Sequence, residues 1–569
     1  MDSKRLILFI ALSFGILFFW QKWMSQRFPQ PANAPTASAP AGSDLPSAAP
    51  RAAGAGAAAS SAAPDTGRLQ SGERIHVKTD LYDAQIDSVG GDLRRVALLK
   101  HGMPGEPNKP FVMLTDGKDH VYVAQTGLLG EGLPTHKAVF TAEQREYALA
   151  PGQNALSVRL TAAGPAGVQI AKVYTFHRGQ YLVDVKYEIV NGGSKPLTAS
   201  AYYRLLRDGQ TDNPGFFGAH TFTGPAIYTE AGKFQKADFA KLDKGTAEYV
   251  KAAKDGWVAM IQHYFASAWV ASPKGQPSLC GPRDCRYEMK RLSDGLYSAG
   301  VIVDLPTIAA GGKFDASMPL FVGPQETRIL DQVAPGFDLI KDYGIFTIFS
   351  KPLFWVLDQI HKVVGNWGWA IILLTVLIKA VFYPLAATSY RSMARMRKLA
   401  PRMEQLKERH GDDKVKFQQA VMEMYKTEKV NPLGGCLPML VQIPIFIALY
   451  WALIAAVELR QAPWMFWIHD LSVKDPYFVL PILMAVSMYI QTSLSPPPPD
   501  PMQAKMMKIM PLAFSVFFLF FPAGLVLYYV VNNVLSILQQ WWITRGIDNE
   551  DKQAKTDKPK KPAPPKKPA

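Results

Sequence analysis

Six apolar runs constrain the fold of this 569-residue chain more than any other feature. One run lies within residues 1–24, and five lie within residues 366–545. A helix needs ~20 mostly apolar residues to cross a bilayer. The runs therefore predict a multi-pass α-helical membrane protein with six transmembrane helices, one N-terminal and five in a C-terminal core. The five core runs are 367–387, 433–457, 477–494, 509–521 and 525–543.

The N-terminal run has two interpretations. Lys4 and Arg5 precede it, which is typical of a cleaved signal peptide or of an uncleaved anchor. Its apolar part ends in the bulky residues FFW, and the first small residues suited to cleavage, at 37–41, lie far downstream. These features favour a transmembrane anchor at 1–24 with a cytoplasmic N-terminus. Residues 25–70 are rich in Ala, Pro, Ser and Gly and predict a flexible tether.

Residues 71–333 have the pattern of a different kind of domain. In YLVDVKYEIVN (181–191), apolar and polar residues alternate with period two, which is typical of a half-buried β-strand. Similar stretches recur, and turn signals such as VGGD and VNGGS separate them. We therefore predict a mainly antiparallel β-sandwich, which the distribution of basic residues places outside the cytoplasm. Because it carries no catalytic constellation, we expect a scaffold or a docking surface.

Enzyme motifs are missing from the sequence. It contains no GxxxxGK[ST], HExxH or GxSxG pattern, so we expect no enzyme and no cofactor. Cys280 and Cys285 frame CGPRDC and can close a disulfide outside the cytoplasm, the alternative being two unpaired thiols. No second Cys or His pair lies nearby at zinc spacing, so no metal site is predicted.

Residues 334–365 mix aromatic residues with regularly spaced charges. Phe354, Leu357, Ile360 and Val364 recur at helical spacing. This pattern predicts an amphipathic helix lying on the membrane surface. The alternative is an ordinary helix packed on the β domain.

Basic segments indicate the orientation of the core. Residues 391–430 carry eleven Lys and Arg against six Asp and Glu, and residues 546–569 form a basic tail that we expect to be disordered. The positive-inside rule places both in the cytoplasm. The first segment predicts two helices on either side of residues 410–412. They form either a basic docking arm that binds ribosomal RNA or anionic lipid headgroups, or a hairpin that merely keeps a loop soluble.

Lys379 is the one full charge in the apolar stretch ILLTVLIKAVFYPLA (372–386). A charge at the middle of a membrane helix is disfavoured by roughly 2.5–3.5 kcal/mol on insertion scales. The lysine either snorkels to the interface or faces a wet, positively charged groove. Such a groove, open to the cytoplasm, would shelter a polar or acidic peptide segment while its apolar neighbours partition into lipid.

Other polar and tyrosine side chains in the apolar runs are predicted to line this groove together with Lys379. The candidate groove residues are Thr375, Gln442, Ser515, Tyr528, Tyr529 and Asn532, and further polar residues in the same runs are Ser487, Gln491 and Asn533.

Four long stretches resemble the YidC/Oxa/Alb family of membrane-protein insertases. They are KVNPLGGCLPMLVQIPIFIALYWAL (429–453), VELRQAPWMFWIHDLSVKDPYFVLPILM (457–484), DPMQAKMMKIMP (500–511) and FPAGLVLYYVVNN (521–533). The resemblance implies a conserved five-helix core with a hydrophilic groove, a periplasmic all-β supersandwich and a flexible cytoplasmic helical hairpin. In relatives the groove charge is usually arginine; the matching residue here is Lys379, which keeps the charge without the bidentate guanidinium.

The resemblance also implies residue roles and partners. Thr375 and the pair Tyr528 and Tyr529 match positions that line the substrate path in relatives. The expected partners are nascent membrane proteins, the Sec translocon (SecYEG and SecDF), anionic lipids, and the ribosome and signal-recognition-particle pathway through residues 391–430 and the tail. We thus expect an inner-membrane insertase and chaperone. The alternatives are a secondary transporter that uses Lys379 as an ion or anion site, and an assembly factor whose β domain is the active part.

Overall fold

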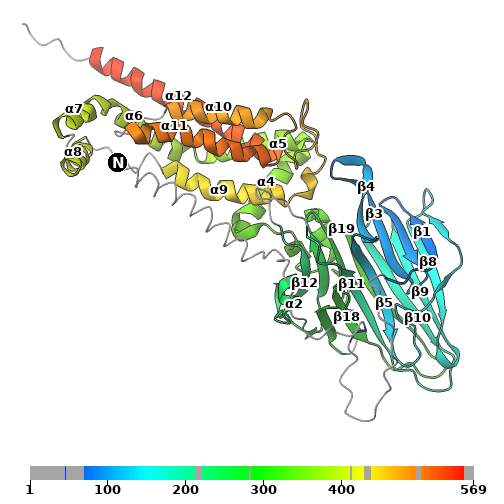
Figure 1. The fold of residues 1–569 in the computed structure, drawn as a ribbon. Helices are drawn as coiled ribbons and strands as arrows, with labels where there is room; N and C mark the ends of the chain where they lie inside the picture. Colours follow the sequence, from blue (N-terminus) through cyan, green and yellow to red (C-terminus); the bar gives the residue numbers. More distant parts are fainter. Residues whose placement is uncertain are drawn as a thin grey trace, which may run out of the picture. The chain divides into compact units, whose positions relative to one another are not determined.

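The computed structural model describes residues 45–46, 69–211, 221–280, 283–410, 413–428, 437–494 and 501–556 (Figure 1). These residues form two compact units, a β-rich unit up to Asp342 and a helical unit from Tyr343 onward. We describe each unit by itself. The predicted anchor at 1–24, most of the tether and the end of the tail lie outside the described residues.

Two sheets build the β unit, and they lie face to face (Figure 1). The strands of the first sheet are β1 (Arg74–Lys78), β2 (Tyr82–Asp87), β3 (Asp92–Met103), β4 (Glu106–Asp116), β5 (Val121–Leu129), β7 (Glu146–Ala148), β11 (Ser200–Arg207), β14 (Ala252–Ala253), β17 (Cys285–Arg291) and β18 (Tyr297–Asp304). Its ten strands have the order β14-β17-β18-β11-β5-β4-β3-β2-β1-β7.

The second sheet has nine strands. They are β6 (Thr141–Ala142), β8 (Ala155–Ala163), β9 (Val168–His177), β10 (Leu182–Asn191), β12 (Gly224–Thr229), β13 (Lys233–Lys236), β15 (Trp257–Gln262), β16 (Phe265–Val270) and β19 (Lys313–Pro324). Their order is β13-β12-β15-β16-β19-β10-β9-β8-β6. Apart from the parallel pair β1 and β7, the strand pairs of both sheets are antiparallel, so the predicted β-sandwich is confirmed.

Strand β10 illustrates why the period-two pattern was informative. It lies between β9 and β19, and alternate residues Val183, Val185, Tyr187 and Ile189 are buried. The hydroxyl of Tyr187 lies 2.8 Å from that of Thr126 on the opposite sheet. The buried side of β10 therefore faces the space between the sheets.

Two details of the β unit bear on the sequence predictions. A disulfide joins Cys280 to Cys285 at the start of β17, with Cα atoms 4.9 Å apart. The predicted helix at 334–365 is wrong at its beginning, because Phe337–Ile340 is a short 3-10 helix of the β unit. Phe337 packs edge-on against Trp257 of β15, with ring centroids 5.0 Å apart, so it belongs to the core of the β unit.

The helical unit begins with α4 (Thr347–Val364), which contains Pro352. The other helices are α5 (Trp367–Val381), α6 (Tyr383–Lys398), α7 (Ala400–His410), α8 (Lys414–Thr427), α9 (Leu437–Ile454), α10 (Val479–Leu494), α11 (Pro501–Ser515) and α12 (Ala523–Thr556). A helix thus lies in each of the five predicted core runs. In the described part of the chain, no single helix is both long and apolar enough to cross a bilayer by itself, whereas α5 and α6 qualify as a pair bent by 67°.

The bend between α5 and α6 determines where Lys379 lies along its helix. The apolar run 367–387 is not one straight helix, because α5 ends at Val381 and Pro384 lies in the first turn of α6. Proline restrains the residue before it and often begins a helix. Lys379 therefore lies in the last turn of α5, where the helix dipole favours a cation.

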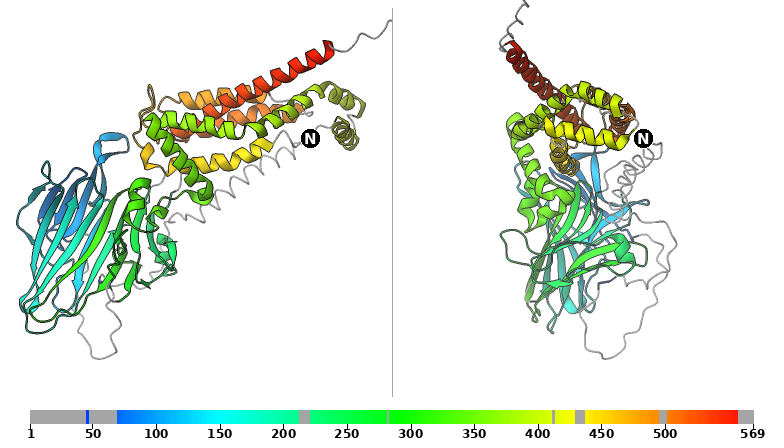
Figure 2. Two further views of the ribbon diagram at one scale, coloured as in Figure 1. Left: turned by 180° about the vertical axis from the view of Figure 1, so that it is seen from behind. Right: turned by 90° about the vertical axis from the view of Figure 1, so that its left-hand side faces the viewer.

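The two basic segments are helical where the structure describes them. Asp413 caps α8 by accepting hydrogen bonds from the backbone N–H groups of Val415 and Lys416, both 3.1 Å long. Helix α12 continues to Thr556, past α10 and α11 (Figure 2), so the prediction of a disordered tail from residue 546 is wrong over its first eleven residues (556 − 546 + 1). Those residues are mostly Asp, Glu, Gln, Lys and Ala, and no proline interrupts them.

Candidate functional site

One side of α12 carries buried polar residues. Asn532, Ser536 and Gln540 recur every four residues and therefore share a helix face, with Asn533 beside them. All four side chains are buried, because α12 packs against α5, α6, α9 and α10. Buried polar groups need hydrogen-bond partners. These four residues, here called the polar stripe, find them on α5, α9 and α10.

Lys379 of α5 meets the polar stripe at Ser536. Its ammonium nitrogen Nζ donates to the hydroxyl Oγ of Ser536 at 2.7 Å, and that hydroxyl donates to the backbone carbonyl of Asn532 at 2.7 Å. The lysine side chain is half-buried. In the described residues it forms no ion pair, so its charge faces a neutral hydroxyl and no carboxylate.

Gln442 of α9 closes the polar stripe from another side. Its amide nitrogen Nε2 donates to Oδ1 of Asn532 at 2.7 Å and to the hydroxyl of Tyr528 at 3.4 Å. Three predicted groove residues, Gln442, Tyr528 and Asn532, are thus in direct contact. Through Ser536, the same network reaches Lys379.

Helix α10 binds the remaining members of the polar stripe. The amide nitrogen of Asn533 donates to the hydroxyl of Ser487 at 3.1 Å, and that of Gln540 donates to the carbonyl of Leu494 at 3.1 Å. One helix, α12, therefore holds hydrogen-bond partners on three neighbours.

Aromatic rings border this network. The ring of Tyr529 lies edge-on to Phe446 with centroids 4.9 Å apart, and its centroid is 5.0 Å from that of Phe518. Tyr528 is buried, whereas Tyr529 is half-buried. The two tyrosines thus have different surroundings, and only Tyr528 joins the hydrogen-bond network through its hydroxyl.

Thr375 and Ser515 behave differently from the other predicted groove residues. The hydroxyl of Thr375 donates to the carbonyl of Ile371 at 2.7 Å, and that of Ser515 donates to the carbonyl of Leu512 at 2.7 Å. Both are buried, and both are satisfied by their own helices. The structure does not link them to Lys379 through a hydrogen bond among the described residues.

Sequence reasoning missed Ser536 and Gln540. A lone serine or glutamine in an apolar run is a weak signal by itself. Their spacing of four and eight residues from Asn532 was the available clue, because it puts all three on one helix face.

Comparison with known proteins identifies the family. Residues 74–356 match the model described as "YidC periplasmic domain", and residues 359–551 match the model described as "60Kd inner membrane protein". The chain belongs to the YidC family of membrane protein insertases. A Membrane protein insertase YidC from Laribacter hongkongensis is 56% identical over 98% of this chain and 100% of its own length. One from Aromatoleum aromaticum is 50% identical over 98% and 100%.

A solved structure of a YidC insertase with its first transmembrane domain is also similar. It is 20% identical, covers 83% of this chain and 92% of its own, and has a TM-score of 0.40. The descriptions of the two family models associate the β unit with the periplasm and the helical unit with the inner membrane.

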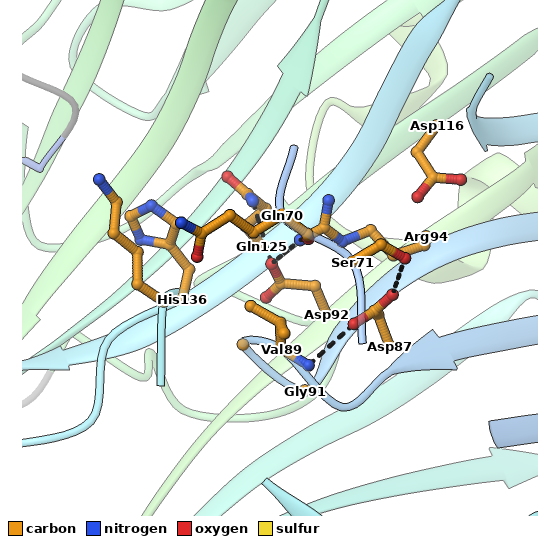
Figure 3. Close-up of polar contacts among 12 residues, drawn as sticks. Gln70, Ser71, Asp87, Val89, Gly91, Asp92, Arg94, Asp116, Gln125 and His136 are labelled. Atoms are coloured by element: carbon orange, nitrogen blue, oxygen red, sulfur yellow. Dashed lines mark hydrogen bonds and ion pairs between the residues drawn. The ribbon is translucent and has the colours of Figure 1, made fainter. Parts of the chain in front are cut away.

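The β unit of this YidC-family chain also buries charged groups, and Asp87 is densely paired among them (Figure 3). The carboxylate of Asp87 accepts hydrogen bonds from the hydroxyl of Ser71 and the backbone N–H groups of Gly72 and Val89, each 2.8 Å long, and pairs with Arg74 at 3.0 Å. These bonds tie the segment before β1 to the turn after β2. Asp87 therefore has a structural role in holding these two segments together.

Asp92 serves a second set of partners in the same unit. It accepts from the amide of Gln125 at 3.0 Å and lies 3.4 Å from Arg94 and 3.7 Å from Lys172. Burial lowers the pKa of Lys172 to about 8, although Asp92 raises it in part. Within the described ranges, no three His, Cys, Asp or Glu side chains are grouped so that they could hold a metal ion.

Proposed function

We propose that this protein inserts integral membrane proteins into the bacterial inner membrane and helps them fold and assemble. It acts alone on small substrates and with the Sec translocon on larger ones. Its relatives are named Membrane protein insertase YidC, which supports the activity. The observation that carries the proposed mechanism is Lys379, whose ammonium has a hydroxyl partner in Ser536 and no ion pair among the described residues.

A substrate group can replace the Ser536 hydroxyl as the partner of the Lys379 ammonium. A neutral hydrogen bond contributes about 1 kcal/mol, and a hydrogen bond to a charged group about 1.5–3 kcal/mol. The Lys379–Ser536 bond already has one charged member, and a carboxylate on an arriving chain adds the opposite charge, so it competes with Ser536. In a low-dielectric surrounding, the same charge attracts such a group more strongly than it would in water.

The polar stripe and Gln442, beside Lys379, form a hydrophilic groove for the polar segment of the substrate. The amide groups of Gln442 and Asn532 offer both donors and acceptors to the backbone of the substrate. Tyr528 and Tyr529 supply ring surface beside them. While the polar segment rests there, its apolar neighbours partition into lipid, and this partitioning drives insertion without a chemical energy source.

The basic segments supply the cytoplasmic contacts. Helices α7 and α8, within the 391–430 arm, and the tail engage the translating ribosome, the signal-recognition-particle pathway and anionic lipids. The excess of Lys and Arg in residues 391–430 supports this role and supports a cytoplasmic location of the arm and of both termini. Co-sedimentation with translating ribosomes tests the contact: binding should weaken with added salt and on removal of the arm.

Insertion by substituted proteins tests the role of Lys379. The substrate is a single-span protein with an acidic residue in its translocated segment, inserted without the Sec translocon. Lys379→Leu should reduce insertion about tenfold, because ~1.5 kcal/mol of charge-assisted binding is lost. Lys379→Arg should preserve it. Lys505→Leu, which removes an exposed lysine from α11, is the matched control and should leave insertion unchanged.

The outcomes separate the hypotheses. Normal insertion of several such substrates by Lys379→Leu would remove the lysine from the mechanism. Ion flux into liposomes that is lost with Lys379→Leu, with insertion intact, would favour the transporter alternative.

A further inference from the structure

The loop between α9 and α10, residues 457–478, joins the ends of three helices. We call it the cap loop. The amide nitrogen of Asn366, which caps α5, donates to the carbonyl of Pro463 at 3.0 Å. The backbone N–H of Ala523, the first residue of α12, donates to the carbonyl of Val473 at 2.7 Å. Since α10 follows the loop directly, α5, α10 and α12 all begin at the cap loop.

Asp475 makes the cap loop rigid. Its carboxylate is buried and accepts hydrogen bonds from the indole N–H of Trp467 at 2.9 Å and from the backbone N–H groups of Tyr477 and Leu480 at 3.0 and 2.8 Å. A second link runs from the N–H of Leu471 to the carbonyl of Ala462 at 3.1 Å. The loop is therefore a folded element with a fixed shape.

Its backbone is strained at bulky residues. Gln461, Phe466 and Phe478 have φ angles of 55°, 52° and 56°, in the left-handed region that favours glycine. Such strain persists only where the surrounding structure imposes it, and it is concentrated at functional positions. Two of these three residues, Phe466 and Phe478, have exposed side chains.

The exposed side chains of the cap loop include aromatic ones. Phe466 is 75% exposed and Tyr477 is 68% exposed, and both belong to the described part of the helical unit. A rigid loop that exposes large aromatic rings would be costly in water, because burying apolar surface is favourable. The cap loop is therefore shaped for a partially apolar surrounding.

The exposed surface of the cap loop continues along two helices. Phe478 at the end of the loop is exposed, and the exposed residues Ile482, Val486 and Ile490 continue its spacing of four along α10. On α5, the exposed residues are Trp369, Leu373 and Leu377, and Trp369 lies edge-on to Trp464 of the loop at 6.0 Å. These apolar stripes are suited to contact with lipid in an inner-membrane protein.

We propose that the cap loop inserts Phe466 and Tyr477 into the boundary between lipid headgroups and acyl chains, as a fixed-depth anchor for the beginnings of α5, α10 and α12. The occupant of this surface is the bilayer itself. Aromatic residues are favoured at this boundary, and the loop lies where two apolar stripes end. The inference rests on the membrane location of the helical unit and is independent of the role of Lys379.

Spin-label accessibility in the full-length protein tests the anchor. The protein carries Cys436→Ser and one of four further substitutions and is placed in nanodiscs of phosphatidylethanolamine and phosphatidylglycerol. The labelled variants are Phe466→Cys, Tyr477→Cys, Ile482→Cys as the lipid control and His469→Cys, an exposed polar position of the same loop, as the aqueous control. Collision rates with oxygen, which enters lipid, and with a nickel chelate, which stays in water, are compared.

We expect the oxygen-to-nickel ratio at positions 466 and 477 to be several-fold higher than at 469 and to approach that at 482. A ratio equal to that at 469 would place the rings in water and overturn the proposal. Protection from both reagents would show that protein covers the loop and would overturn it as well. If Phe466→Cys does not fold, the label at position 477 decides the test.

Discussion

Asp87 of the β unit and Lys379 of the helical unit differ in how completely their charges are paired. In the β unit, Asp87 receives three hydrogen bonds and a guanidinium, so no capacity is left for a ligand. In the helical unit, Lys379 meets a neutral hydroxyl of Ser536 and no ion pair among the described residues. A buried charge whose hydrogen-bonding capacity is filled by the protein, here called saturated, stabilises the fold, whereas a charge with only one neutral partner can still bind a substrate. The difference distinguishes a structural site from a candidate functional one.

The largest expected effect is on the saturated charge. Asp87→Ala leaves Arg74 and several N–H groups without their partner and should lower the free energy of unfolding of the β unit by roughly 3–5 kcal/mol. Denaturant unfolding of the full-length protein measures it. Asp83→Ala, on the same strand, removes only the partly exposed partner of Arg95 and is the matched control. Equal losses of stability from the two substitutions would contradict the claim that the partners of Asp87 stabilise the β unit more than an exposed ion pair does.

The next effect concerns the buried Lys172. Its pKa is lowered to about 8 in the folded protein, below its value in the unfolded chain, so unfolding takes up protons between these two values. The β unit should therefore gain roughly 2–3 kcal/mol of stability as pH rises from about 8 toward 10, since each pKa unit corresponds to ~1.4 kcal/mol. Lys172→Met should abolish the rise. A rise that persists in this variant would assign it to another group.

A smaller effect is expected at the partner of Lys379. Ser536→Ala removes the competing hydroxyl and should increase the binding of an acidic substrate segment by about fivefold, equivalent to ~1 kcal/mol. Crosslinking yield to a stalled nascent chain measures it. Ser493→Ala, at an exposed position on α10, is the control. A loss of binding as large as that of Lys379→Leu would mean that Ser536 itself holds the substrate.

The smallest effect sets the baseline for a charge pair in water. Arg402 of α7 pairs with Glu428 directly after α8, and their side chains are 64% and 36% exposed. Arg402→Ala should change the stability of the helical unit by less than about 1 kcal/mol. Thermal unfolding followed by circular dichroism measures it. A change as large as that of Asp87→Ala would contradict the distinction between saturated buried charges and exposed pairs.

Local patterns predicted much of the fold. The alternation in 181–191 identified β10, and a described helix lies in each of the five apolar runs of the core. The order of the strands could not be predicted, because β11 pairs with β5, far away in the sequence. Period two specifies which face is buried but not which strand lies alongside.

The site was predicted in part. Gln442, Tyr528 and Asn532 are in contact, whereas Thr375 and Ser515 bond within their own helices. That these residues line a groove stays a prediction. Hydroxyl groups on helices have this local option, and composition cannot reveal which one a residue uses. The apolar run 367–387 gave no sign that its helix ends at Val381, because the effect of Pro384 on the helix was not considered.

The most direct test of the account is charge reversal at Lys379. Insertion is compared for two single-span substrates that differ by one residue in the translocated segment, acidic in one and basic in the other. The native protein should insert the acidic substrate better, and Lys379→Glu should prefer the basic one. An unchanged preference in a folded Lys379→Glu protein would contradict the claim that this ammonium receives the substrate.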